Sequence, residues 1–200
     1  MANVSRKGFW PVRYLNGSCW NGAAQVYAVA TDVGTINIGD FVSMDGGALS
    51  YGDSSYKTVV RAAATNTSVL GVLVGYEVSA PGLSNGRTPN LDNPITVAAT
   101  GKVQLVRVVD DMSVLFEGQT SSTTTFAVTA LGLNCGLTLG TADATNGIST
   151  MEIDSTTFAT NTTLPIRLVD VANRPDNPSD TNRKVLVKIN ASMLYGLQGL

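Results

Sequence analysis

Lys184-Val185-Leu186-Val187-Lys188-Ile189-Asn190 is the stretch that decides the fold class of this chain. Val185, Val187 and Ile189 fall on one side of an extended backbone and the two lysines on the other, because successive side chains of a β-strand point to opposite faces. This alternation predicts a strand that is buried on one face and open to solvent on the other.

Similar short apolar runs recur along the chain and predict strands at residues 25–30, 40–44, 58–62, 70–78, 95–99, 102–109, 114–119, 137–139, 151–153 and 164–171. Turn-forming residues such as Asp45-Gly46-Gly47 and Asn146-Gly147 separate these runs. Short strands and turns at this spacing predict an antiparallel β-sandwich or β-barrel, and a jelly roll is one topology that fits. Only residues 125–133 have helical spacing, so we expect at most one short helix or helical turn.

Apolar residues make up 44% of the 200 residues and charged residues only 14%. The length fits one domain with a single sizeable core, and the apolar fraction excludes a disordered chain. Hydroxyl, amide and glycine residues must therefore cover much of the surface, which suits packing against neighbours without desolvating many charges. We expect residues 21–200 to form a single β domain behind an N-terminal arm over residues 1–20.

The predicted arm carries large aromatic side chains on a segment that Pro11 and Gly17 interrupt. Such an arm is expected to extend and to dock onto another surface. The rings either cover an end of the chain's own barrel or contact a partner chain, and the residue types favour neither interpretation. The residues predicted to make the contact, if it is with a partner chain, are Arg6, Lys7, Phe9, Trp10, Arg13, Tyr14 and Trp20.

Histidine is absent from the chain, which removes the side chain that titrates nearest neutrality and is the commonest metal ligand. Gly82-Leu83-Ser84-Asn85-Gly86 has the spacing of a Gly-x-Ser-x-Gly nucleophile elbow, but without histidine the usual base of a serine nucleophile is missing. Asp110-Asp111 is the best candidate for acid–base or cation chemistry, but a calcium loop needs more oxygens at fixed steps. The favoured interpretation is a turn in which aspartate accepts backbone amides. We therefore expect no enzyme activity, no catalytic residue, no metal and no cofactor.

Gly71-Val72-Leu73-Val74-Gly75 has the glycine content of a nucleotide-binding loop. It lacks the third glycine of the dinucleotide fingerprint and the Gly-Lys-Ser/Thr of a P-loop, and no helix is expected after it. Glycines within a strand instead predict a bulge, a bend or a close approach of another backbone.

Nucleic acid and membrane are not expected partners. The net charge of −2 argues against broad nucleic-acid binding. The longest apolar run, residues 69–78, contains two glycines and Glu77 and is too short for a membrane span. No signal-peptide pattern follows Arg6-Lys7, so we expect synthesis in a cytoplasm, with Cys19 and Cys135 as two free, partly buried thiols.

Four stretches resemble small virion structural proteins of tailed bacteriophages, in particular capsid decoration or cement proteins. They are Gly8-Phe9-Trp10-Pro11-Val12-Arg13-Tyr14-Leu15-Asn16-Gly17, Leu70-Gly71-Val72-Leu73-Val74-Gly75-Tyr76-Glu77, Val109-Asp110-Asp111 through Phe116-Glu117-Gly118-Gln119, and Leu164-Pro165-Ile166-Arg167-Leu168 through Arg174-Pro175-Asp176-Asn177. The resemblance spans most of the chain, although none of these stretches is a chemical signature.

The resemblance implies a noncatalytic β-rich protein that binds the outside of an icosahedral shell, on virions assembled in the host cytoplasm. Such a protein clamps neighbouring major capsid subunits, and many modest contacts then strengthen the shell together. It also implies sister protomers, with a homotrimer favoured and a dimer as the other option.

Three other classes of function stay open at this stage. A phage tail or fibre component would share the composition rich in Thr, Ser and Gly, but the chain lacks long repeats. A carbohydrate-binding adhesin module would use exposed aromatic rings on a β-sandwich. An enzyme is the third, and would require hydrolase activity that is lost when Asp110 or Asp111 is changed.

Overall fold

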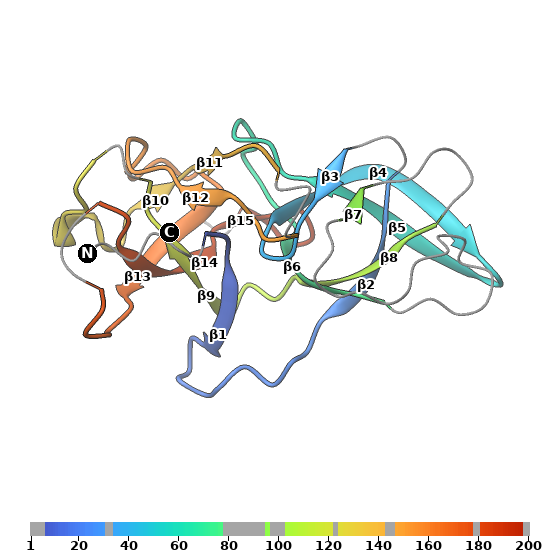
Figure 1. Ribbon diagram of the computed structural model, residues 1–200, viewed down its shortest axis with the longest axis horizontal. Helices are drawn as coiled ribbons and strands as arrows, with labels where there is room; N and C mark the ends of the chain where they lie inside the picture. Colours follow the sequence, from blue (N-terminus) through green and yellow to red (C-terminus); the bar gives the residue numbers. More distant parts are fainter. Residues whose placement is uncertain are drawn as a thin grey trace.

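The computed structural model describes residues 7–30, 34–77, 95–96, 103–121, 124–142, 147–177 and 181–197. The protein is all-β, as predicted, and its elements are arranged along an elongated molecule (Figure 1). The strands are β1 (Trp10–Tyr14), β2 (Gln25–Val29), β3 (Thr35–Ile36), β4 (Phe41–Tyr51), β5 (Ser54–Arg61), β6 (Gly71–Tyr76), β7 (Ile95–Thr96), β8 (Leu105–Val109), β9 (Val114–Gln119), β10 (Asn134–Cys135), β11 (Leu137–Leu139), β12 (Met151–Ile153), β13 (Ile166–Val171), β14 (Lys184–Ile189), β15 (Ala191–Ser192) and β16 (Gly196–Leu197).

A closed barrel at one end of the molecule has the strand order β2-β5-β4-β6-β8 (Figure 1). Its strands pair antiparallel except β2 and β5, which run parallel and close the barrel. The antiparallel prediction is therefore correct for four of these five pairings. Apolar side chains fill the barrel, and the fully buried ones include Ile36, Val42, Leu70 and Leu73.

A five-stranded sheet forms the other end, in the order β1-β9-β14-β13-β10. β14 lies at its centre and contains the stretch that predicted the fold class. Val185, Val187 and Ile189 are fully buried, as the alternation predicts. The opposite face is less open than predicted, since Lys184 and Leu186 are only 6% and 7% exposed.

One hydrophobic cluster joins the sheet to the barrel. Phe9 precedes β1, Phe41 begins β4 of the barrel and Phe116 lies in β9, and all three are fully buried. The ring centroids of Phe9 and Phe41 are 4.6 Å apart, and those of Phe41 and Phe116 are 5.9 Å apart. Gly118 makes room for this stack, because a Cβ at that position would lie 2.4 Å from Phe9 Cε1.

The prediction of an extended N-terminal arm is wrong for residues 7–20. Trp10 pairs with Glu117 and Tyr14 with Val114, so β1 is the edge strand of the sheet beside β9 (Figure 1). Phe9 is part of the core. Backbone pairing with β9 and burial of the Phe9 ring hold this segment in the sheet, although Pro11 suggests an irregular segment. Residues 1–6, including Arg6, lie outside the described residues.

Several strand bounds agree with the prediction, and β9, β11 and β12 match it at both ends. The hairpin of β4 and β5 is longer than predicted, because Ala48 pairs with Lys57 and Ser50 with Ser55 in an exposed stretch without apolar alternation. The short strands β1, β3, β10, β15 and β16 were not predicted. Three of the predicted strands extend beyond the described residues, at position 78 of 70–78, positions 97–99 of 95–99 and position 102 of 102–109.

The helical spacing of residues 125–133 corresponds to a single 3-10 turn, η1 (Val128–Ala130), the one helical element in the described part of the chain.

The glycines of β6 behave as predicted. The register shifts between Leu73 and Gly75, which is a bulge, and a Cβ on Gly71 would lie 2.2 Å from the Val109 carbonyl oxygen. Within the ranges described, no helix has the length and apolar character needed to span a bilayer.

Candidate functional site

The aromatic side chains predicted to dock outward pack mainly against the chain's own sheet. Tyr14 and Trp20 are half-buried and contact the cluster around Phe9. The Tyr14 hydroxyl donates to Asn21 Oδ1 at 2.8 Å, and Trp20 Nε1 donates to the Ala23 carbonyl at 3.3 Å. Trp10 is also half-buried, in β1. Of the two interpretations of these rings, cover for the chain's own β structure is the one that their burial favours.

The basic residues of the predicted interface also have partners within the chain. Lys7 Nζ lies 3.0 Å from Glu152 Oε2 in β12, and the other carboxylate oxygen accepts a hydrogen bond from Gln119. Arg13 contacts Asp170 of β13 at 3.5 Å, where both side chains are well exposed. Lys7 therefore helps to hold the segment before β1 in place, whereas Arg13 stays at the surface.

The edge strand β1 and the residue that follows it expose two apolar side chains to solvent. Val12 is 42% exposed and Leu15 is 47% exposed, with Arg13 between them in sequence. We call Val12, Arg13 and Leu15 the β1 surface. The segment after β1 folds back along this edge, since Tyr14 N–H donates to the Ser18 carbonyl and Trp20 N–H to the Val12 carbonyl. A partner here would therefore contact side chains more than an open row of backbone groups.

A buried ion pair connects the barrel to the segment before β12. Asp40 is fully buried, and its Oδ2 accepts from Arg61 Nε at 3.0 Å and from the Asn37 N–H at 2.9 Å. Ser149 Oγ donates to Asp40 Oδ1, and Arg61 also donates to the Gly140 carbonyl and to Thr150 Oγ1. The arrangement is structural, because these groups mostly satisfy one another.

Burial raises the pKa of the Asp40 carboxyl above its ordinary value, while Arg61, Ser149 and the Asn37 N–H oppose this shift. Sequence reasoning missed this ion pair. Asp40 and Arg61 lie 21 positions apart and belong to no local motif that could have identified them.

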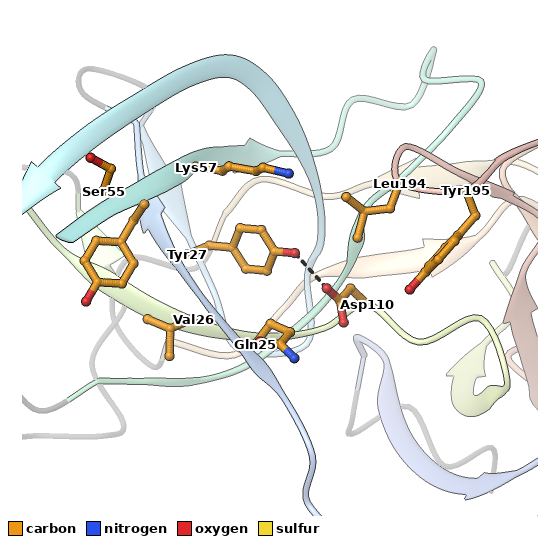
Figure 2. A pocket seen from close by; sticks show the side chains of 9 residues that line it. Gln25, Val26, Tyr27, Ser55, Lys57, Asp110, Leu194 and Tyr195 are labelled. Atoms are coloured by element: carbon orange, nitrogen blue, oxygen red, sulfur yellow. Dashed lines mark hydrogen bonds between the residues drawn. The ribbon is translucent and has the colours of Figure 1, made fainter.

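A surface pocket of about 370 Å³ lies at the barrel, where β2 and β5 run parallel (Figure 2). Residues from β2, β5, the end of β8 and the turn after β15 come together in it. Its lining consists of Gln25, Val26, Tyr27, Ser55, Tyr56, Lys57, Asp110, Leu194 and Tyr195.

Tyr27 and Asp110 form the central contact of the pocket. The Tyr27 hydroxyl donates to Asp110 Oδ2 at 2.7 Å (Figure 2). Burial and this hydrogen bond raise the pKa of Tyr27, so the phenol keeps its proton at neutral pH. Tyr195 lies on the rim and is 64% exposed. The pocket can offer hydrogen bonds and aromatic surface to a ligand.

The structure separates the two carboxylates of Asp110-Asp111. Asp111 Oδ1 accepts from the Ser113 N–H at 2.8 Å and from Ser113 Oγ at 2.7 Å, so the predicted turn with an aspartate bonded to a backbone amide is confirmed. Asp110 belongs to the pocket instead. Across the described residues, no three His, Cys, Asp or Glu side chains come together to hold a metal.

The two cysteines are free thiols, as predicted. Their burial differs from the prediction, since Cys19 is exposed and Cys135 is fully buried in the main cluster. Burial raises the pKa of the Cys135 thiol, which therefore stays neutral.

No family model, curated protein or solved structure matches this chain.

Proposed function

We propose that this chain is a noncatalytic structural protein of a tailed-bacteriophage virion, located on the capsid exterior. It binds the major capsid protein and stabilises the contacts between neighbouring capsid subunits. The resemblance of four stretches to decoration proteins supports this proposal. The charge-poor composition supports it as well, because neutral polar surface can be buried at low cost.

The β1 surface is the observation that carries the proposal. Two of the large apolar side chains exposed in the described part of the chain belong to this surface, Val12 within β1 and Leu15 directly after it. Arg13 between them contacts Asp170 at 3.5 Å, but both side chains are well exposed, so its guanidinium can also pair with a carboxylate of the partner. An apolar centre with a charged neighbour is the usual composition of a protein interface. The contact residues of this proposal are therefore a subset of the first 20 residues, with Phe9 excluded by its burial.

Binding to shells that lack the protein tests the proposal. Purified chain is mixed with empty capsids, and the bound fraction is measured by co-sedimentation. Val12→Asp and Leu15→Asp are each expected to weaken binding by roughly tenfold or more, because a carboxylate would be desolvated without a partner. Deleting residues 1–14 is a poor test, since it removes β1 and the buried Phe9.

Val128→Asp is the matched control, because Val128 is 57% exposed and lies in η1, away from β1 in the chain. This variant should bind shells as the unchanged protein does. Equal binding by all three variants would exclude the β1 surface. Binding to isolated tails or fibres, with none to shells, would favour the tail alternative and overturn the capsid proposal.

The proposal includes self-association, with a homotrimer favoured over a dimer. A trimer would place copies around a symmetry axis of the shell. Light scattering over a range of concentrations should give the mass of three chains. A monomer at every concentration, and single copies on the shell, would contradict this part of the proposal.

A further inference from the structure

We propose that the pocket between β2, β5 and the turn after β15 binds a neutral carbohydrate of one or two sugar rings. The inference does not depend on the capsid proposal, since the pocket shares no residue with the β1 surface. It assigns a ligand to the place where the described structure combines a hollow, oriented polar groups and exposed aromatic side chains.

The polar groups of the pocket can both donate and accept. Asp110 Oδ2 accepts from Tyr27, and this bond leaves Asp110 Oδ1 to accept from a ligand. Gln25 offers an amide donor and an acceptor, and Lys57 offers donors only. Figure 2 shows Gln25, Tyr27 and Tyr195 grouped around Asp110. Neighbouring hydroxyl groups of a sugar, each both donor and acceptor, complement such a set.

Aromatic surface is the second requirement for a sugar, whose C–H faces pack on rings. Tyr195 is 64% exposed at the rim, and Tyr56 also lines the pocket. A phenol presents an apolar ring together with a polar end, which suits a ligand that is apolar on its faces and polar around its edge. A carbohydrate can therefore pack its C–H face on the exposed tyrosine ring and form hydrogen bonds with the polar groups beside it.

Charge and size narrow the ligand class. Lys57 and Asp110 are the two charged residues of the lining and carry opposite signs, so the pocket has no net charge to favour an anion or a cation. The volume of about 370 Å³ is at the small end of ligand pockets, which commonly span about 300–1,000 Å³. These features favour a neutral mono- or disaccharide over a phosphate ester or a long chain.

An NMR titration of the full chain tests the inference. The probes are maltose, cellobiose, lactose and N,N′-diacetylchitobiose, with inorganic phosphate as the anionic comparison. At least one sugar should shift the amide signals of residues 25–27, 55–57, 110 and 194–195 saturably, with a Kd on the order of 1 mM or tighter. Phosphate should not shift them.

Two pocket variants and one control test whether the sugar binds in this pocket. Gln25→Ala and Tyr195→Ala change exposed side chains, so both proteins should fold, and each should weaken sugar binding roughly tenfold. Val128→Ala, at a similarly exposed site outside the pocket, should bind as the unchanged protein does. The proposal is overturned if no sugar shifts the pocket signals, if the shifts map elsewhere, if both pocket variants bind normally, or if phosphate binds more tightly.

Discussion

At the scale of single residues, Asp40 is the clearest case of a group whose environment decides its behaviour. It is fully buried against Arg61, Ser149 and the Asn37 N–H. Burying a carboxylate costs free energy through desolvation. The attraction of a nearby guanidinium can be smaller than this cost. The raised pKa of Asp40 says that the desolvation cost is the larger effect here.

This balance predicts a pH dependence of stability. Asp40 has an ordinary pKa of 3.8 in the unfolded chain and a higher one in the folded protein. Between the two values the folded protein binds more protons, so the contribution of Asp40 to stability is fully present below the lower pKa. It is lost as the pH rises through the higher one.

Comparison with Asp40→Asn isolates this contribution from the other carboxylates. The free energy of unfolding is measured by urea denaturation of both proteins between about pH 3 and about pH 7. The stability of the unchanged protein relative to the variant should decrease as the pH rises. A relative stability that increases with pH would mean that Arg61 outweighs desolvation, contrary to the prediction.

At the scale of elements, the sheet strands depend on a close fit between β9 and the segment before β1. Gly118 of β9 faces the Phe9 ring, and a Cβ would lie 2.4 Å and 2.6 Å from two of its carbons. Phe9 also stacks on Phe41 of the barrel, so the ring has little freedom to move away. This contact explains why an apparently loose N-terminal segment is held in the core.

Gly118→Ala is therefore expected to destabilise the protein by about 1–3 kcal/mol, the usual cost of overpacking a core. Gly75→Ala is the matched control, because Gly75 also lies in a strand but a Cβ there meets nothing within 4 Å. Urea denaturation should give a lower midpoint for the first variant and a nearly unchanged one for the second. Equal midpoints would show that the Phe9 ring moves aside at little cost.

At the scale of the whole molecule, the barrel and the sheet share one hydrophobic cluster. Phe41 and Val72 of the barrel and Phe116 and Val187 of the sheet belong to it, while the barrel interior forms a second cluster. The ion pair of Asp40 and Arg61 adds a polar connection to the segment before β12. Separating the two ends would expose both contacts to water.

The shared cluster predicts that both ends unfold in one transition. Trp10 and Trp20 lie in or against the sheet, so tryptophan fluorescence reports on that end, whereas far-ultraviolet circular dichroism reports on strands of both ends. The two signals should give the same denaturant midpoint. A fluorescence midpoint clearly apart from that of circular dichroism would mean that the ends unfold independently.

Local patterns in the sequence predict much of the strand content. Alternation and turn residues place β9, β11 and β12 correctly, and the glycines of β6 predict its bulge. These features can be predicted from the sequence because the side-chain period of a strand and the conformation of a turn depend on adjacent residues. The prediction that Phe9 belongs to an extended arm failed, because the burial of its ring depends on β9, which lies more than 100 positions away in the chain.

The amino-acid sequence by itself determined the β class, most strand positions and the charge-poor, histidine-free composition. Only the tertiary structure decided the parallel pairing of β2 and β5, the burial of Lys184 and the pocket around Asp110. Tyr27 and Asp110 are 83 positions apart, and no local pattern links them. The physical reason is that pairing and burial follow from the free energy of the whole packed chain, whereas periodicity follows from backbone geometry within each segment.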